Sequence, residues 1–179
     1  MAIETIRLGG GGEGEAEAFK ALRLHGLRND PISFANTEEE MAIRTIDDIV
    51  AELRANIVVG VLKEGKDLVG VGGIRREAAG KMNHKGLIYG NYVRPEMRGK
   101  GIGKLIMLEL EKQARETAPT ALLPGFEELQ LRVVEGNDPA IKLYKSVGYE
   151  EFGYAARAVR YKGDYVGEYY MHKYLTEGK

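Results

Sequence analysis

Apolar residues recur along the chain with two periods, and each period predicts one type of element. Alternation of apolar and polar residues, or a short β-branched run, predicts a strand, whereas apolar residues every three or four positions predict a helix. Thr37 followed by Glu40 is a capping-box pattern that starts a helix, and Gly148 ends one. The pattern therefore predicts strands over residues 3–8, 57–62, 68–74, 86–93, 129–134 and 167–174, two helices within 15–55, and further helices over 102–115 and 139–147.

The order of these elements predicts one mixed domain over residues 1–179. Strands 57–62 and 68–74 are separated by the short polar linker 63–67, which indicates an antiparallel pair. No internal repeat, low-complexity tail or interdomain linker interrupts the sequence. We expect a mixed sheet with helices on its faces, in a single α/β or α+β domain.

Composition and charge narrow the function by what they exclude. The 26 Lys and Arg residues nearly balance the 27 Asp and Glu residues, so no bulk field attracts nucleic acid or anionic lipid. No basic leader precedes an apolar run, and no stretch approaches the roughly 20 apolar residues of a membrane span. The chain has no cysteine, which excludes a disulfide framework and a thiolate nucleophile. We expect a soluble, cytoplasmic protein with no nucleic-acid or membrane partner and no metal site, because the three histidines are dispersed: His25, His84 and His172.

A glycine-rich segment between a predicted strand and a predicted helix carries the clearest chemistry. It reads VRPEMRGKGIG over residues 93–103, with Arg98 and Lys100 adding positive charge. Glycines let backbone N–H groups approach an anion, and the helix that follows presents its unpaired N–H groups and positive dipole end. A dinucleotide fingerprint would need glycine at Lys104, and a Walker loop would need Ser or Thr at Leu105. The segment therefore predicts a pyrophosphate site of another kind.

A second block, NDPAIKLY over residues 137–144, opens the predicted helix 139–147. Asp138 can cap this helix with Pro139 at its first position. Helical spacing places Tyr144 on the apolar face. Without a further motif, a packed core aromatic with a satisfied hydroxyl is the default interpretation of such a tyrosine.

Together the two blocks resemble the acetyl-CoA-binding motifs of the GNAT superfamily of N-acetyltransferases. The first block matches V-x-P-x-x-R-G-x-G-I-G, and the second matches N-x-x-A-x-x-L-Y followed by a glycine and an aromatic residue, so the resemblance spans about residues 87–149. It implies a GNAT-like acyl-CoA N-acyltransferase fold whose sheet opens between strands 86–93 and 129–134 to admit the pantetheine arm. It also implies acetyl-CoA or CoA as cosubstrate, and homodimers are frequent in that family.

The resemblance further assigns roles to residues. The backbone of Tyr92 and Val93 would bind the pantetheine and orient the thioester carbonyl. Asn137 and Tyr144 would flank the sulfur, and Tyr144 would act as the general acid. The pyrophosphate would be bound by Arg98, Gly99, Lys100, Gly101, Ile102 and Gly103.

The favoured function is transfer of an acetyl group from acetyl-CoA to a primary amine, directly within a ternary complex, because no cysteine is present to form the usual thiol acyl-enzyme. The alternative is a non-catalytic acyl-CoA sensor or regulatory module. Glu135 and the run Glu38–Glu40 are the candidates for the base. The acceptor is a small-molecule or peptide amine, and the use of acyl groups other than acetyl stays open.

A second glycine loop, residues 9–14, also has the dinucleotide spacing, but we reject a cofactor site there. Glu13, Glu15 and Glu17 would oppose a pyrophosphate at the start of the helix. The tyrosine-rich last strand, 167–174, could line the acceptor pocket. Strand alternation, however, sends its two consecutive tyrosines, 169 and 170, to opposite faces.

Overall fold

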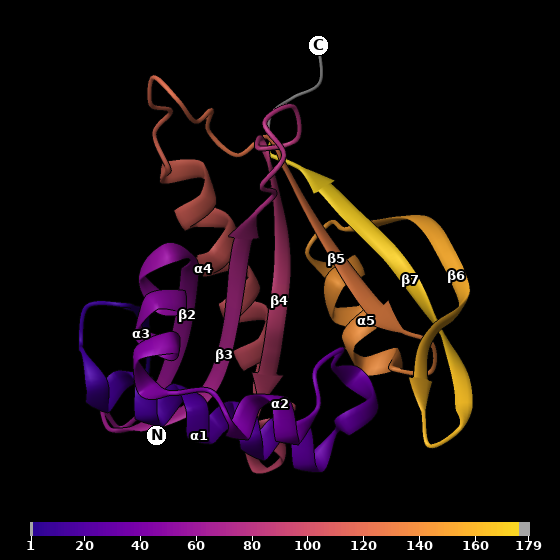
Figure 1. Cartoon of the computed structure of the whole chain (residues 1–179), viewed down its shortest axis with the longest axis horizontal. Helices are drawn as coiled ribbons and strands as arrows, with labels where there is room; N and C mark the ends of the chain where they lie inside the picture. Colours follow the sequence, from indigo (N-terminus) through magenta and orange to yellow (C-terminus); the bar gives the residue numbers. More distant parts are fainter. Residues whose placement is uncertain (1, 176–179) are drawn as a thin grey trace.

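In the computed structural model, which describes residues 2–175, seven strands form one mixed sheet in the order β1-β2-β3-β4-β5-β7-β6 (Figure 1). Residue 1 and residues 176–179 of the predicted domain lie outside the described part. The strands are β1 (Ile3–Leu8), β2 (Ile57–Lys63), β3 (Asp67–Arg76), β4 (Lys85–Val93), β5 (Glu128–Val134), β6 (Glu150–Tyr161) and β7 (Asp164–Tyr174). The helices are α1 (Glu13–Asn29), α2 (Glu38–Ala42), α3 (Ile46–Ala55), α4 (Ile102–Glu116) and α5 (Asp138–Ser146), with 3-10 turns η1 (Pro31–Ser33) and η2 (Pro95–Met97). The predicted mixed sheet with flanking helices is confirmed.

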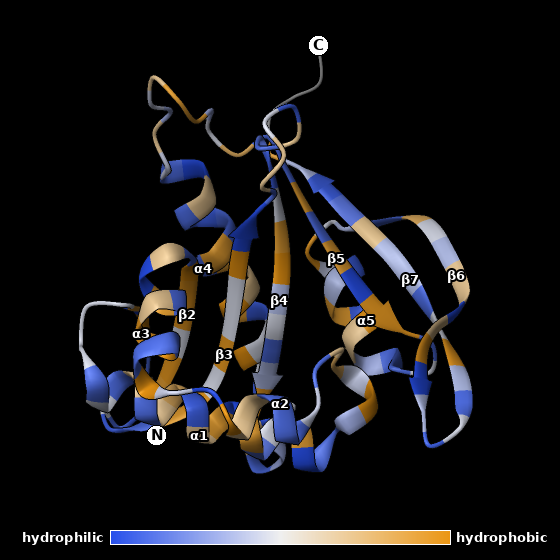
Figure 2. Cartoon of the chain, viewed as in Figure 1, coloured by the Kyte–Doolittle hydropathy of each residue, from blue (hydrophilic) through white to orange (hydrophobic). Residues whose placement is uncertain are grey.

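The helices cover the two faces of the sheet in two groups. In Figure 1, α1, α2 and α3 lie in front of the sheet, and α4 and α5 lie behind it. Each group buries its own core: Phe19 and Leu22 of α1 pack with Val71 on one side, whereas Met107 and Leu110 of α4 pack on the other. Figure 2 shows the corresponding apolar residues along the central strands. None of the helices within residues 2–175 is long and apolar enough to cross a membrane.

β4 and β5 are the only parallel neighbours in the described sheet, and they pair over a short distance. Their pairing runs from Lys85↔Glu128 to Leu87↔Gln130, three residue pairs in all. Beyond that point the two strands diverge and leave a V-shaped gap in the sheet (Figure 1). The opening that the family resemblance implied between these strands is therefore confirmed.

A β-bulge in β4 decides which side chains face which side of the opening. β4 carries one extra residue relative to β3 between Tyr89 and Tyr92, and Gly90 there has a φ of +67°. In an unbroken strand Tyr89 and Tyr92, three residues apart, would face opposite sides. The bulge turns both towards α1, where the Tyr92 hydroxyl lies 2.8 Å from His25 Nδ1, and it sends Asn91 towards α4 and α5.

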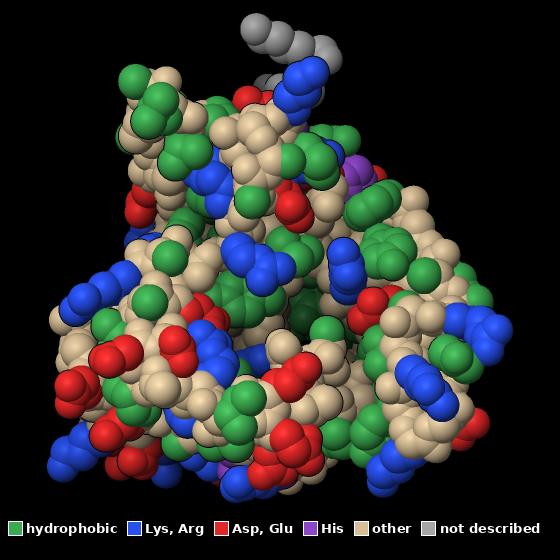
Figure 3. Space-filling model, viewed as in Figure 1, with side chains coloured by type: hydrophobic (Ala, Val, Ile, Leu, Met, Phe, Trp, Pro, Cys, Tyr) green, Lys and Arg blue, Asp and Glu red, His purple; other side chains and the backbone are tan. Residues whose placement is uncertain are grey.

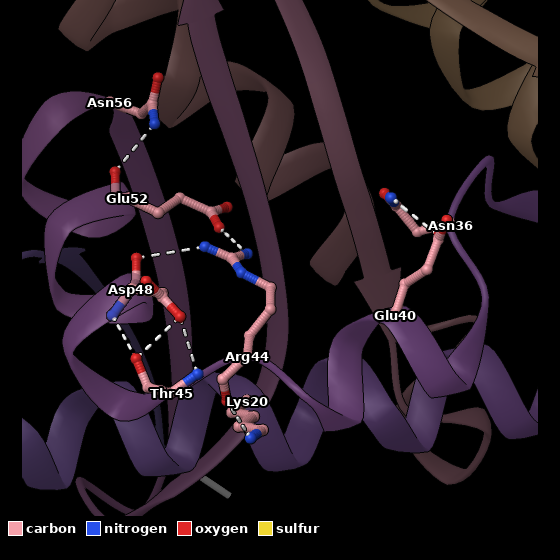
Figure 4. A network of polar contacts seen from close by, with 8 residues as sticks. All are labelled: Lys20, Asn36, Glu40, Arg44, Thr45, Asp48, Glu52 and Asn56. Atoms are coloured by element: carbon pink, nitrogen blue, oxygen red, sulfur yellow. Dashed lines mark hydrogen bonds and ion pairs between the residues drawn. The ribbon is translucent and has the colours of Figure 1, made fainter.

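The expectation of two helices within residues 15–55 is wrong, because the second is divided into α2 and α3. The predicted capping box of Thr37 and Glu40 is present at the start of α2. A second capping box starts α3: Thr45 Oγ1 accepts from the Asp48 N–H at 3.1 Å, and Asp48 Oδ2 accepts from the Thr45 N–H at 2.9 Å (Figure 4). Threonine at a cap adopts extended backbone, so Thr45 ends helical continuity even though the apolar spacing continues through it.

Strand β6 was missing from the expected elements. It pairs antiparallel with β7 through a two-residue turn, Lys162–Gly163, in which both residues have positive φ. Most residues of β6 are exposed, so the segment lacks the apolar alternation that predicts a strand. The last strand correspondingly begins at Asp164 rather than at Gly167.

Candidate active site

A cleft of about 360 Å³ lies where β4 and β5 separate, between the start of α4 and the start of α5. Figure 3 shows the molecule hollowed at the centre of the face over this gap. Lys100, which we expected at the pyrophosphate, does not line the cleft, because its Nζ donates to the Glu96 carbonyl at 2.9 Å. Lys104 lines the cleft instead. The structure brings the other nine predicted residues together there: Tyr92, Val93, Arg98, Gly99, Gly101, Ile102, Gly103, Asn137 and Tyr144.

The loop before α4 leaves a row of backbone donors free. Gly99 and Gly101 have φ of +73° and +79°, and Gly101 is the left-handed cap of α4. In the part of the chain that the structure describes, none of the backbone N–H groups of residues 99–104 donates to another backbone group. The first turn of a helix also carries the positive end of its dipole. The loop is therefore built to accept an anion on backbone N–H groups.

Arg98 spans one end of the cleft. Its Nε donates to the Val93 carbonyl at 3.0 Å, and its guanidinium forms an ion pair with Asp30 at the end of α1. Cζ lies 5.6 Å from the centre of the Tyr92 ring. The positive charge of Arg98 is thus partly compensated, and the Val93 carbonyl, which was expected to contact pantetheine, already accepts from this side chain.

Tyr144 lies on α5 at the opposite end, with only 8% of its surface exposed. Its hydroxyl is 3.4 Å from Asn91 Nδ2, which also lies 3.1 Å from Met107 Sδ. Burial raises the pKa of Tyr144, and the contact with Asn91 opposes part of that rise. The phenol is therefore protonated at neutral pH and able to donate a proton.

Asn91 is a site residue that the sequence reasoning missed. No partner within residues 2–175 accepts or donates at its buried Oδ1, so the amide has hydrogen-bonding capacity left in the cleft. No motif marks this position, because its direction depends on the bulge at Gly90.

Asn137, rather than Asp138, is the cap of α5, which corrects the expectation by one residue. Asn137 Oδ1 accepts from the Ala140 N–H at 3.3 Å, and Asp138 occupies the first helical position beside Pro139. The Asn137 Nδ2 lies 3.3 Å from Ser33 Oγ in η1. Asn137 therefore connects the two sides of the cleft as well as starting the helix.

The carboxylates considered as bases do not line the cleft. Glu135 is exposed and accepts from the Tyr154 hydroxyl at 2.8 Å. Glu38 forms an ion pair with Arg28, and Glu40 completes the capping box of α2. Each of these groups has a local structural role outside the cleft.

The rejected glycine loop at residues 9–14 holds an anion of its own. The Glu15 carboxylate accepts from the Gly9 N–H at 3.0 Å and from the Gly11 N–H at 2.6 Å. A pyrophosphate would have to displace this carboxylate, which supports the rejection of a dinucleotide site. No group of three potential metal ligands occurs among residues 2–175.

The two neighbouring tyrosines of β7 do face opposite sides, as strand alternation predicted. Tyr169 packs against the core under α4. Tyr170 lies on the other side, with Arg132 Cζ 5.4 Å from its ring centre, and it lines a second cavity of about 230 Å³ beside β5. Tyr170 is thus the member of the pair that can contact an acceptor on the α1 side of the sheet.

Comparison with known proteins gives three kinds of match. A sequence model of the acetyltransferase (GNAT) family matches residues 22–149. Thialysine N-epsilon-acetyltransferases of Bos taurus and Sus scrofa are 34% and 33% identical over 79 residues, which is 43% of this chain and 42% of theirs. The match thus spans less than half the length of these relatives.

Solved structures share the fold over nearly the whole chain. A GNAT-family acetyltransferase from Streptococcus pneumoniae superposes with a TM-score of 0.79 at 19% identity, covering 98% of this chain and 100% of that one. A GNAT superfamily phosphinothricin acetyltransferase from Sinorhizobium meliloti, in complex with AcCoA, gives a TM-score of 0.77 at 20% identity, covering 99% and 91%.

Proposed function

This chain belongs to the acetyltransferase (GNAT) family, and from that membership we propose that it transfers an acetyl group from acetyl-CoA to a primary amine, directly within a ternary complex. We further propose that residues 1–179 act as one domain in the cytoplasm on a small-molecule or peptide amine, without a metal. Assembly as a homodimer stays a prediction from the resemblance.

One observation carries the proposal: a single cleft contains both an anion-accepting loop and a buried, protonated phenol. The free N–H groups of residues 99–104 would hold the pyrophosphate of CoA, and Lys104 would add charge. The gap between β4 and β5 would take the pantetheine, which ends near Tyr144 and Asn91.

The chemistry needs a neutral amine, an electrophilic carbonyl and an acid. The amine nitrogen attacks the thioester carbonyl and forms a C–N bond, and collapse of the tetrahedral intermediate breaks the C–S bond. The departing thiolate takes the proton of the Tyr144 hydroxyl. The ammonium proton leaves to water, because Asp30, the only carboxylate that lines the cleft, is paired with Arg98.

Release of free CoA on addition of amines tests the proposal. The chain has no cysteine, so a thiol reagent added to acetyl-CoA, protein and an amine library reports CoA alone. We expect amine-dependent release above the protein-free rate. The alternative, a non-catalytic acyl-CoA sensor, predicts that acetyl-CoA binds in a calorimeter but that no amine causes CoA release.

A further inference from the structure

A buried cation on the α1 side of the sheet lacks an acidic partner. Arg23 of α1 is only 5% exposed. Within residues 2–175 its guanidinium forms no ion pair shorter than 4.0 Å, and its one hydrogen bond runs from Nη1 to the Gly90 carbonyl at 3.2 Å. Burial lowers the pKa of this group, a sign that the charged form is poorly compensated. A buried charge in a folded protein is normally paired, so the remaining donors point to a partner that binds from outside.

The position of Arg23 is built into the fold at the edge of the cleft. Its Cζ lies 4.7 Å from the centre of the Phe34 ring, and Phe34 lines the cleft. A Cβ at Gly90 would lie 3.2 Å from Arg23 Nη1, so the glycine of the bulge leaves the room that the guanidinium occupies. The same bulge belongs to the stretch of β4 that borders the opening towards β5.

Tyr89 provides a second unused donor beside Arg23. Its hydroxyl is buried and has no hydrogen-bond partner in the described residues. Burial raises the pKa of Tyr89, and the charge of Arg23 opposes that rise, which places the two groups near each other. Glu52, whose charge acts on both groups, is already bound by Arg44 through a hydrogen-bonded ion pair (Figure 4).

We infer that Arg23, assisted by Tyr89, binds a carboxylate of the amine acceptor, so that this chain acetylates amino acids or other amines that carry a carboxylate. The inference rests on the proposed acetyl transfer and deepens it. A guanidinium offers two parallel N–H donors that match the two oxygens of a carboxylate. One guanidinium and one neutral phenol also match a single negative charge better than the double charge of a phosphate monoester.

Matched acceptors separate this role from a structural one. Each amino acid of a panel is assayed beside its own carboxamide, which keeps the amine and the side chain but removes the carboxylate. We expect wild type to favour the acid, and Arg23→Gln to lower kcat/KM for the acid about 10- to 100-fold, mainly through KM. For the amide, kcat/KM stays within about twofold, because no charged hydrogen bond is lost.

Three further variants make the test specific. Arg28→Gln removes the same charge from an exposed position on the same helix and leaves the acid-to-amide ratio unchanged. Arg23→Lys keeps the charge without the fork and gives an intermediate ratio. Tyr89→Phe lowers the ratio less than Arg23→Gln, and together with Arg23→Lys it serves if the glutamine variant does not fold.

Two outcomes would overturn the inference while leaving acetyl transfer intact. Equal turnover of acid and amide by wild type would show that no carboxylate is recognised. An equal fall for both acceptors in Arg23→Gln, Arg23→Lys and Tyr89→Phe would show that Arg23 only supports the bulge at Gly90. By contrast, no release of CoA with any amine would contradict the proposed function itself.

Discussion

The α4 side of the sheet and the α1 side offer a ligand different kinds of group. On the α4 side, consecutive backbone N–H groups of residues 99–104 form the anion site. On the α1 side, Arg23 and Tyr89 come from segments far apart in the chain and meet only through a bulge and helix packing. A backbone site needs glycines in a row and therefore leaves a motif, whereas a site assembled from side chains leaves none. The identity of the cofactor is accordingly easier to infer from such a sequence than the identity of the acceptor.

The largest expected effect is at Tyr144, which lies where the two sides meet. Tyr144→Phe removes only the hydroxyl, so CoA affinity and folding persist while kcat and kcat/KM fall together by about 10² to 10⁴. The acid form acts below its pKa, and burial raises that pKa, so we expect no loss of wild-type rate from this group up to pH 10. Steady-state kinetics from pH 7 to 10 measure both effects.

Tyr154→Phe is the control for this change, since its hydroxyl contacts Glu135 outside the cleft. It should leave kcat unchanged. If Tyr144→Phe turned over within about twofold of wild type, Tyr144 would be a packing residue, and acid catalysis would have to come from water.

The backbone site is broken most directly at Gly101. Gly101→Asp places a carboxylate at the left-handed cap where the phosphates would approach, and we expect CoA affinity to fall at least about 100-fold, roughly 2.7 kcal/mol. Gly101→Asn is the matched control, because asparagine tolerates the same backbone conformation without the charge. Isothermal titration with CoA compares them, and equal affinity for the aspartate variant and wild type would remove the loop from the site.

Cofactor choice sharpens the same side of the comparison. Because Lys104 and Leu105 break the dinucleotide and Walker spacings, CoA should stabilise the protein more than NAD or ATP at equal concentration. At 100 times its dissociation constant, CoA should raise Tm by roughly 5 to 10 °C. Thermal-shift measurements with the three ligands decide the point, and a larger shift with NAD or ATP would contradict the assignment.

The smallest effect is expected at Arg98, and it separates side-chain from backbone binding. Arg98→Ala should weaken CoA binding only about two- to fivefold, because the backbone donors remain and Asp30 already compensates its charge. The loss should shrink as salt is raised. Lys100→Ala, outside the cleft, should have no effect on titrations at low salt, and a loss larger than that of Gly101→Asp would assign the site to side chains.

How far the sequence predicts this fold depends on whether its signals are local. Six of the strands and the loop before α4 follow from contiguous patterns. The break between α2 and α3 was missed because helical apolar spacing continues through Thr45, where side-chain capping overrides it. β6 was missed because its residues are exposed and show no alternation, although the turn at Lys162–Gly163 is a typical hairpin signal.

The site divides in the same way. The motif residues of α4 and α5 reach one cleft because each is fixed by its own helix start. Asn91, Tyr89 and Arg23 could not be placed, because one extra residue at Gly90 reverses the side on which the preceding and following residues lie. Strand alternation read without the bulge puts Tyr89 and Tyr92 on different faces and separates groups that lie together.

The three-pair seam between β4 and β5 also has a mechanical consequence. β5, β6, β7 and α5 are held to the rest of the sheet by few interstrand hydrogen bonds, so this part of the molecule can open separately from β1–β4. A linear, amide-bearing molecule in the gap would complete the missing part of the ladder and link the two parts. Amide hydrogen exchange should therefore slow in β4 and β5 when CoA is added, while exchange at the distant β1–β2 pairing changes little.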